Sequence, residues 1–156
     1  MGTAVVIIVV AGVLASAATL LVWARRRLLV VSVVGRSMEP TLRSGDRVLA
    51  RRVPLARVRR GDVVVLAAPA QMADDSQPPS QESPGLLIKR AFAVPGDPVP
   101  VERVPILGGQ SAAEVPVGHL VALGDNPPWS YDSREIGYFR EESVLGVVVR
   151  PRLPAS

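Results

Sequence analysis

The amino-acid sequence predicts an all-β domain that follows one apolar N-terminal helix. Residues 4–23 form an uncharged apolar run, as in a helix that contacts lipid. After residue 27 the sequence changes to short segments rich in β-branched residues, separated by turn sequences. The chain also contains 15 prolines and 13 glycines among 156 residues, which favours many short strands over alternating strands and helices. We expect no helix longer than one or two turns beyond the first.

The apolar run matches the length of a helix that crosses the hydrocarbon core of a bilayer. The run ends with a tryptophan, a residue typical of membrane interfaces, and three arginines at residues 25–27 follow it, as is typical of the end of a membrane-spanning helix. A cleaved signal peptide is the alternative, because Ala15-Ser16-Ala17 resembles a cleavage site. However, no Lys or Arg precedes the run, and the apolar stretch continues past this site. We therefore predict a membrane anchor at residues 1–27 and a separate domain at residues 28–156.

Six later segments are predicted to be strands because Val, Leu and Ile dominate them: residues 28–34, 47–51, 62–66, 86–94, 120–123 and 144–149. Four Gly-Asp pairs lie at segment edges, where glycine supplies positive φ and aspartate bonds its own backbone: Gly45-Asp46, Gly61-Asp62, Gly96-Asp97 and Gly124-Asp125. Residues 69–85 are rich in Pro, Ser, Gln and Asp, and we interpret them as an exposed flexible loop.

The residue inventory limits the chemistry open to the chain. The absence of cysteine excludes disulfides and thiolate nucleophiles, and the single histidine, His119, cannot build a metal site. The net charge of +4 raises the question of nucleic-acid binding, but an aromatic content of 4% leaves little to stack on bases. We therefore expect no metal, no cofactor and no nucleic-acid partner.

Lys89 is the only lysine among the 18 basic residues. Arginine cannot be deprotonated in a protein, whereas a buried lysine can lose its proton and act as a base. On a strand, Lys89 shares a face with Leu87, Ala91 and Ala93, and the opposite face is apolar too. Burial would need to lower its pKa from about 10.4 to about 7–8, which desolvation can supply.

A serine upstream offers the matching nucleophile. Ser37 follows the first predicted strand, and a glycine two residues before it and a proline three after predict a constrained loop with an exposed hydroxyl. A serine hydroxyl is a poor nucleophile until a neighbouring base removes its proton. His119 has no acidic partner nearby in the sequence, so the pair of Ser37 and Lys89 is our leading hypothesis. Taken without the lysine, the serine fits an ordinary turn better.

Four segments resemble, in order, the sequence boxes of type I signal peptidases, the membrane-bound peptidases with a Ser/Lys dyad. Residues 35–42 resemble the serine box, 60–65 the next box, 89–97 the lysine box and 124–134 the last box. With the apolar N-terminal segment, the resemblance extends over nearly the whole chain. It implies a β-sandwich-like or partly open barrel domain with an apolar surface against the membrane.

The resemblance also implies roles for individual residues. Ser37 matches the nucleophile, Lys89 the general base, and Ser130 the serine that orients the lysine amine. Asp132 and Arg134 match an ion pair that supports the site, and Asp125 and Asn126 match the turn that positions the segment around Ser130. The substrate is expected to be an extended peptide with small residues one and three before the cut. Its expected contacts are Gly35, Met38 and Pro40.

The sequence departs from the family pattern near both serines. Some members carry a serine two residues before the nucleophile, where its hydroxyl helps to hold the oxyanion, but this chain has Gly35. The Ser37 backbone N–H remains one expected donor. Pro127-Pro128-Trp129 replaces a more polar stretch and stiffens the loop before Ser130. The predicted catalytic domain is also short, without a large inserted domain.

These features predict a membrane-bound serine endopeptidase that removes signal peptides from exported precursors through an acyl-enzyme. A maturation protease dedicated to one precursor, with the same dyad, is the alternative, and its catalytic domain could face the cytoplasm. An inactive membrane binding module is disfavoured because both dyad residues are present. The family's substrates emerge on the extracytoplasmic face, whereas the positive-inside rule would keep the arginines after the apolar run in the cytoplasm. We favour the extracytoplasmic side.

Overall fold

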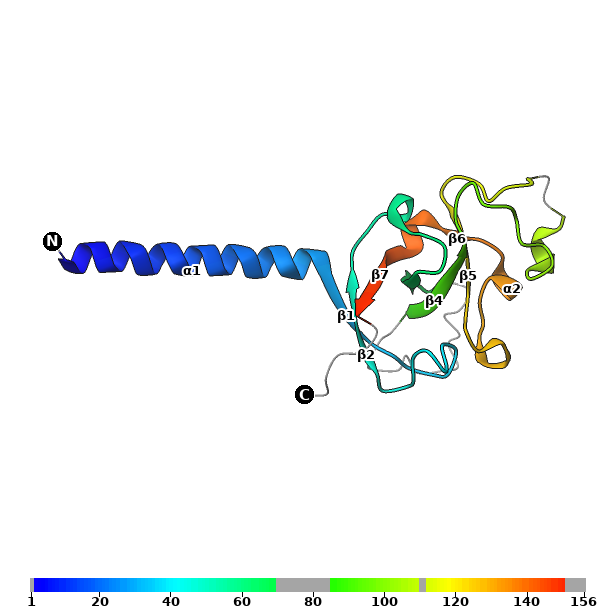
Figure 1. The fold of residues 1–156 in the computed structure, drawn as a ribbon, viewed down its shortest axis with the longest axis horizontal. Helices are drawn as coiled ribbons and strands as arrows, with labels where there is room; N and C mark the ends of the chain where they lie inside the picture. Colours follow the sequence, from blue (N-terminus) through cyan, green and yellow to red (C-terminus); the bar gives the residue numbers. More distant parts are fainter. Residues whose placement is uncertain (1, 70–84, 110–111, 151–156) are drawn as a thin grey trace.

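The computed structural model describes residues 2–69, 85–109 and 112–150, and within them it contains one long helix and seven strands (Figure 1). Helix α1 (Gly2–Arg27) leads directly into the strands, which are β1 (Leu28–Ser32), β2 (Arg47–Arg51), β3 (Val63–Ala67), β4 (Leu86–Ala93), β5 (His119–Leu123), β6 (Phe139–Arg140) and β7 (Val144–Arg150). The remaining helices are single turns, namely η1 (Leu55–Arg57), η3 (Pro105–Leu107), η4 (Pro127–Trp129), α2 (Ser133–Ile136) and η5 (Glu141–Ser143). The predicted all-β class is confirmed.

Helix α1 projects away from the sheet as a separate rod (Figure 1). Large apolar side chains on it are exposed, among them Ile7, Leu14, Leu20 and Trp23. The predicted N-terminal helix is therefore present. No helix in the described ranges combines the length and the apolar character that crossing a membrane requires.

The seven strands form one antiparallel sheet in the order β1-β2-β7-β3-β4-β5-β6. The sheet curls into a half-barrel, in agreement with the partly open barrel that was expected (Figure 1). Strand β7 lies between β2 and β3, so it joins the part of the sheet that carries β1 and β2 to the part that carries β3 to β6. The segments that bear Ser37 and Lys89 belong to these two different parts.

Successive side chains of a strand point to opposite faces, so the central strands contribute to two apolar clusters. One cluster contains Val64, Leu66 and Ala91, together with buried residues of β5 and β6 and of the β2–β3 connection. The other contains Val65 and Ile88, together with buried residues of β1, β2 and the serine loop. Strand β4 is therefore covered on both faces, which explains how it can bury a charged side chain.

Two expectations need correction. Strand β6 was not predicted, because two residues are too few to display an alternating pattern. The positive φ expected of the glycine in each Gly-Asp pair is found at Gly45, Gly61 and Gly96, with values of 91°, 92° and 87°. The expectation is wrong for Gly124, which has no positive φ. The loop expected at residues 69–85 falls mostly on residues 70–84, which lie outside the described residues.

Candidate active site

Ser37 lies in the loop between β1 and β2 and is half-buried. Two apolar side chains fix this loop from below, since Met38 and Leu42 have exposed fractions of only 1% and 0%. The Leu42 amide donates to the Met38 carbonyl at 2.9 Å, which closes a turn directly after the serine. Before the serine, Gly35 adopts a φ of 86°, a conformation that glycine accommodates without strain. The sequence thus holds Ser37 on a tight loop above a packed base.

Lys89 comes from the middle of β4 and is buried, with an exposed fraction of 3%. Its backbone pairs with Val64 of β3, and its side chain shares a face with Ala91 in the first cluster. Burial lowers the pKa of the Lys89 amine below its ordinary value of 10.5, and the charge of Asp132 only partly opposes this shift. The lowered pKa increases the neutral fraction of the amine, which is the form that can accept a proton.

The Lys89 amine belongs to a chain of hydrogen bonds. Lys89 Nζ donates to Ser130 Oγ at 2.9 Å, and Ser130 Oγ donates to Asp132 Oδ2 at 2.6 Å. Because the Ser130 proton points to the carboxylate, its oxygen is left to accept an amine proton. This polarity orients one N–H bond of the lysine and leaves its lone pair to point elsewhere.

Asp132 is fully buried and ends this chain of hydrogen bonds. Burial alone would raise the pKa of its carboxyl, but hydrogen bonds from Arg134, Gly124 and Ser130 outweigh burial and hold the pKa below its ordinary value. Arg134 donates through Nε at 2.9 Å and Nη2 at 2.5 Å, and the Gly124 amide donates at 2.7 Å. Asp132 also caps α2, so the helix and the ion pair fix the carboxylate together.

Gly124 connects the two serines. It is buried, and a Cβ at this position would lie 2.2 Å from Ser130 Oγ and 2.7 Å from the Ser37 carbonyl oxygen. Asn126, two residues after Gly124, donates its backbone N–H to the same Ser37 carbonyl at 2.9 Å. Its side-chain amide donates to the Arg36 carbonyl at 3.0 Å. The structure therefore brings the Ser37 loop against the hydroxyl that binds Lys89.

A second network lies beside the first and supports the same loops. Arg90 binds Asp125 through two parallel hydrogen bonds of 2.7 and 2.6 Å, and it also donates to the Gly61 carbonyl at 2.9 Å. Thr41 donates to the same carboxylate at 2.6 Å. Burial alone would raise the pKa of Asp125, but the hydrogen bonds from Arg90 and Thr41 lower it below its ordinary value. Arg90 and Thr41 were not among the expected site residues.

Arg36 and Trp129 connect the outer ends of the two serine loops. The Arg36 guanidinium carbon lies 4.6 Å from the centre of the Trp129 ring, within the range of a cation–π interaction. Arg36 also pairs with Glu39 at 3.2 Å. The two residues flank Ser37 and Ser130 in the sequence, so this contact borders the site.

A pocket of about 170 Å³ opens next to Ser37, between the end of β1 and the start of β4. Its walls are formed by residues 31–34, Ser37, Met38 and residues 86–88. β1 is an edge strand, and β5 pairs with β4 only from residue 90 onwards among the described residues. The pocket thus lies between two strand segments that each have an unpaired edge. Of the expected substrate contacts, Met38 lines this pocket, whereas Gly35 and Pro40 are exposed and do not line it.

His119 lies apart from the Lys89 network. Its Nδ1 is 3.0 Å from the Val117 carbonyl, and its ring meets the edge of Tyr138 at 5.4 Å between ring centres. In the part of the chain that the structure describes, no group of three or more His, Asp or Glu side chains is arranged to hold a metal ion.

Comparison with known proteins shows to which family this chain is similar. A family profile described as "Signal peptidase, peptidase S26" matches residues 1–108 and 104–152. The chain is 30% identical over 136 residues to "Signal peptidase I" of Leptolyngbya laminosa, a match that covers 75% of this chain and 64% of that protein. It is 34% identical over 110 residues to the human "Mitochondrial inner membrane protease subunit 1", covering 69% of this chain and 59% of that protein. It is 24% identical over 148 residues to "Signal peptidase I V" of Bacillus subtilis (strain 168), covering 74% and 80%. The chain thus spans less than two thirds of the first two relatives.

Proposed function

The chain belongs to the peptidase S26 family of signal peptidases, and from this premise we propose that it is a serine endopeptidase acting on precursor proteins. In this proposal Ser37 is the nucleophile and Lys89 is the general base. The observation that carries the assignment is the buried Lys89 amine, held 2.9 Å from Ser130 Oγ beside the Ser37 loop. Its lowered pKa supports the same role, because a base must be neutral to accept a proton.

The reaction proceeds in two steps through an acyl-enzyme. Neutral Lys89 accepts the Ser37 hydroxyl proton while the serine oxygen attacks the scissile carbonyl carbon. The resulting oxyanion accepts a hydrogen bond from the Ser37 backbone N–H. The tetrahedral intermediate then expels the amine of the mature protein, which takes the proton from Lys89. In the second step, Lys89 removes a proton from water, which attacks the ester carbon. The Ser37 oxygen then leaves and takes this proton from Lys89, and the cleaved segment is released with a new C-terminal carboxyl group.

We propose that the substrate binds as an extended segment between β1 and the start of β4. Among the residues that the structure describes, both strands have an unpaired edge beside Ser37, and backbone hydrogen bonds to such edges give affinity for a peptide strand. A pocket of about 170 Å³ suits small side chains near the cut. This supports cleavage of signal peptides, which carry small residues at these positions according to the family resemblance.

The direct test is cleavage of a panel of precursors by the full chain in detergent, followed by sequencing of the new N-termini. We expect cuts that follow small residues, and no cut by Ser37→Ala. Cleavage by Ser37→Ala at the same sites would mean that another residue is the nucleophile. Cleavage at sites without small flanking residues would contradict the binding mode.

A maturation protease dedicated to one precursor is the second candidate. The exposed Trp129, 60% accessible beneath the Arg36 guanidinium, favours it because this pair gives the rim of the site a distinctive surface. The same precursor panel separates the two candidates. Cleavage of many unrelated signal peptides at similar rates supports the general enzyme, whereas cleavage of a single precursor supports the dedicated one.

We also propose that α1 attaches the protein to a membrane, because several of its large apolar side chains, such as Leu14, Leu20 and Trp23, are exposed. Retention of the full chain in membranes during alkaline carbonate extraction is the expected result, and complete release would contradict it. The extracytoplasmic position of residues 28–156 remains our proposal for the domain. Protease added to intact cells should degrade the domain, and full protection until lysis would place it in the cytoplasm.

A further inference from the structure

The connection between β2 and β3 concentrates positive charge on the surface. Between residues 47 and 61 the chain has no acidic residue. All six arginines in this stretch are exposed, and five of them lie between residues 51 and 60. Exposed Arg27 at the end of α1 lies beside these five, because its carbonyl accepts the Arg52 amide at 2.9 Å. We call these six residues the arginine surface: Arg27, Arg51, Arg52, Arg57, Arg59 and Arg60.

The fold fixes the direction of these side chains. The apolar residues of the connection, Val53, Leu55 and Val58, are buried in the first cluster, whereas the arginines before, among and after them are exposed. The backbone is pinned at both ends of the run. The Arg57 amide closes the η1 turn on the Pro54 carbonyl at 2.9 Å, and the Asp62 carboxylate accepts the Arg59 amide at 2.9 Å. The charges are therefore displayed on an ordered loop.

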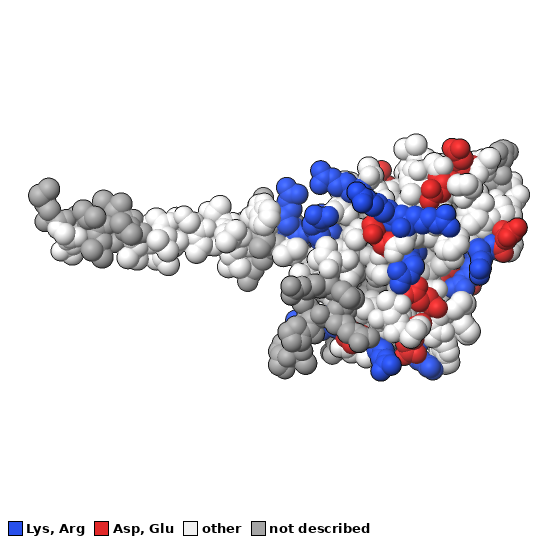
Figure 2. Space-filling model, in the orientation of Figure 1, with Lys and Arg blue, Asp and Glu red and all other residues white. Residues whose placement is uncertain are grey.

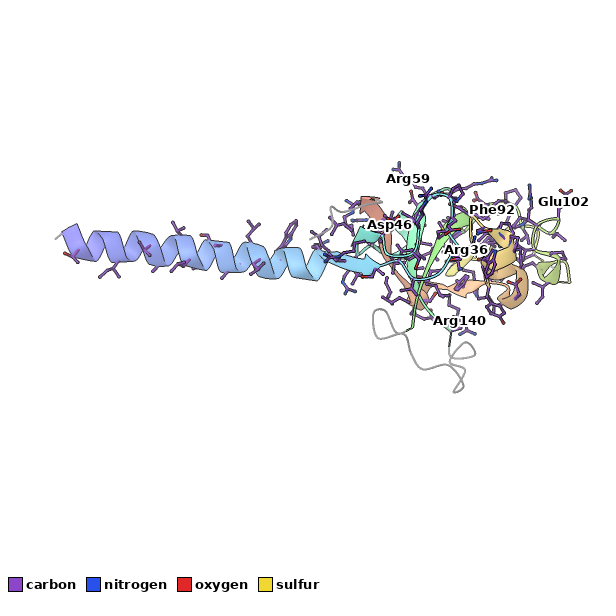
Figure 3. The ribbon with its side chains drawn as sticks, turned by 90° about the horizontal axis from the view of Figure 1, so that it is seen from below. Arg36, Asp46, Arg59, Phe92, Glu102 and Arg140 are labelled. Carbon is purple, nitrogen blue, oxygen red and sulfur yellow. The ribbon has the colours of Figure 1, made fainter. Side chains whose placement is uncertain are left out.

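Ion pairs among the described residues do not neutralise the charges of this surface. None of the salt bridges found among the described residues involves an arginine of this surface. Arg60 lies over the Phe92 ring at 5.5 Å, a contact that leaves its charge in place. Figure 2 shows basic side chains running from the α1 junction along one border of the domain, with many of the acidic side chains farther from the helix. Figure 3 shows Arg59 at the border opposite Arg140 and remote from Glu102.

We propose that the arginine surface docks the domain onto anionic phospholipid headgroups. It begins where the exposed apolar helix ends, so a membrane that holds α1 would face it first. Guanidinium groups bind phosphate through paired hydrogen bonds, and basic segments next to a membrane-attached helix are attracted to anionic lipid. A single-stranded nucleic acid would also need stacking platforms, and the described aromatic ring at this surface, Phe92, is covered by Arg60. The inference rests on the proposed membrane attachment of α1 and not on the peptidase chemistry.

The test compares binding of the full chain to vesicles of phosphatidylcholine alone and to vesicles that also contain phosphatidylglycerol. Neutral vesicles report the contribution of α1, and the difference between the two compositions reports the charges. We expect the double variant Arg57→Gln/Arg59→Gln to lose roughly 30-fold in affinity for the anionic vesicles only, on the basis of about fivefold per arginine. The charge-matched control Arg103→Gln/Arg140→Gln replaces exposed arginines elsewhere and is expected to change this affinity less than about threefold.

A second measurement reports position, so that tight binding through α1 cannot hide the effect. The chain has no cysteine, so a single fluorophore can be placed at Ala56→Cys, in η1, or at exposed Ala113→Cys. Headgroup-located quenchers should quench the label at residue 56 more than that at 113, and only in anionic vesicles. Equal quenching at both positions would overturn the proposal, as would equal affinity of the two double variants. Loss of duplex DNA binding by Arg57→Gln/Arg59→Gln without any change on vesicles would also overturn it. Cleavage measured in detergent is independent of these outcomes.

Discussion

Replacement of Gly124 by alanine tests whether the two serine loops must meet. The glycine has no positive φ, so its backbone accepts an alanine without conformational strain. The added methyl is the whole perturbation. It would lie 2.2 Å from Ser130 Oγ, 2.6 Å from Ser130 Cβ and 2.7 Å from the Ser37 carbonyl oxygen. Ordinary contacts between such atoms are about 3.5–4.0 Å, so both loops must retreat.

The magnitude follows from the displacement. Relief of a 2.2 Å contact requires Ser130 Oγ to move by about 1 Å or more, which is enough to break its 2.9 Å hydrogen bond from Lys89. A misplacement of about 1 Å in a catalytic arrangement can lower the rate about 100-fold, and we expect a loss of that size in kcat/KM. Overpacking a buried position also costs about 1–3 kcal/mol in the free energy of unfolding.

The assay compares kcat/KM on one cleaved precursor with the free energy of unfolding in urea, for Gly124→Ala and for Gly109→Ala. Gly109 is the matched control, because it also lacks a positive φ, and a Cβ there would have no described atom within 4 Å apart from those of its chain neighbours. We expect the control to retain the original values in both measurements. A folded Gly124→Ala protein with unchanged kcat/KM would refute the reasoning, since the lysine amine would then not depend on the position of Ser130.

Three further outcomes are expected. Lys89→Arg should fall to the activity of Ser37→Ala with an unchanged circular dichroism spectrum, because arginine stays charged; clear residual turnover would exclude the lysine as base. Since burial lowers the pKa of Lys89, activity should rise as the pH increases through that lowered value. At pH values between the lowered pKa and 10.5, Lys89 still holds a proton in the unfolded chain but has released it in the folded chain, so the free energy of unfolding should also rise with pH. An equal slope of this free energy against pH in Lys89→Met would contradict the reasoning. His119→Ala should keep normal kinetics, because its ring contacts Tyr138 away from the site, and an inactive folded variant would assign a role to the histidine.

The strands were predictable because their signal is local. β2 has the predicted bounds, residues 47–51, and the predicted strands that correspond to β3 and β4 differ from the observed ones by one residue at their ends. Each of these strands alternates or is apolar on both faces, a pattern that needs no knowledge of the neighbours. The position of β7 between β2 and β3 could not be predicted in this way, since pairing depends on which edges meet in space.

The candidate site likewise contains residues that the sequence indicated and contacts that it could not indicate. The family resemblance singled out Ser37, Lys89 and Ser130, and the structure gathers them around Gly124, while their catalytic roles remain our proposal. The sequence did not indicate the bond between Thr41 and Asp125, which joins residues 84 positions apart. Alternation along β4 offered one clue, because a side chain next to a buried lysine must point to the opposite face.

The central position of β7 in the sheet has a consequence for folding during synthesis on the ribosome. Among the described strands, β7 is synthesised last, yet the backbone hydrogen bonds that join β2 to β3 across the sheet all pass through it. Until residues 144–150 emerge, the half that carries the serine loop and the half that carries the lysine strand share no strand pairing in the described sheet. Such long-range closure makes folding slow. A nascent chain without this strand therefore cannot join the two parts of the described sheet, so the proposed catalytic residues would come together only after residues 144–150 are made.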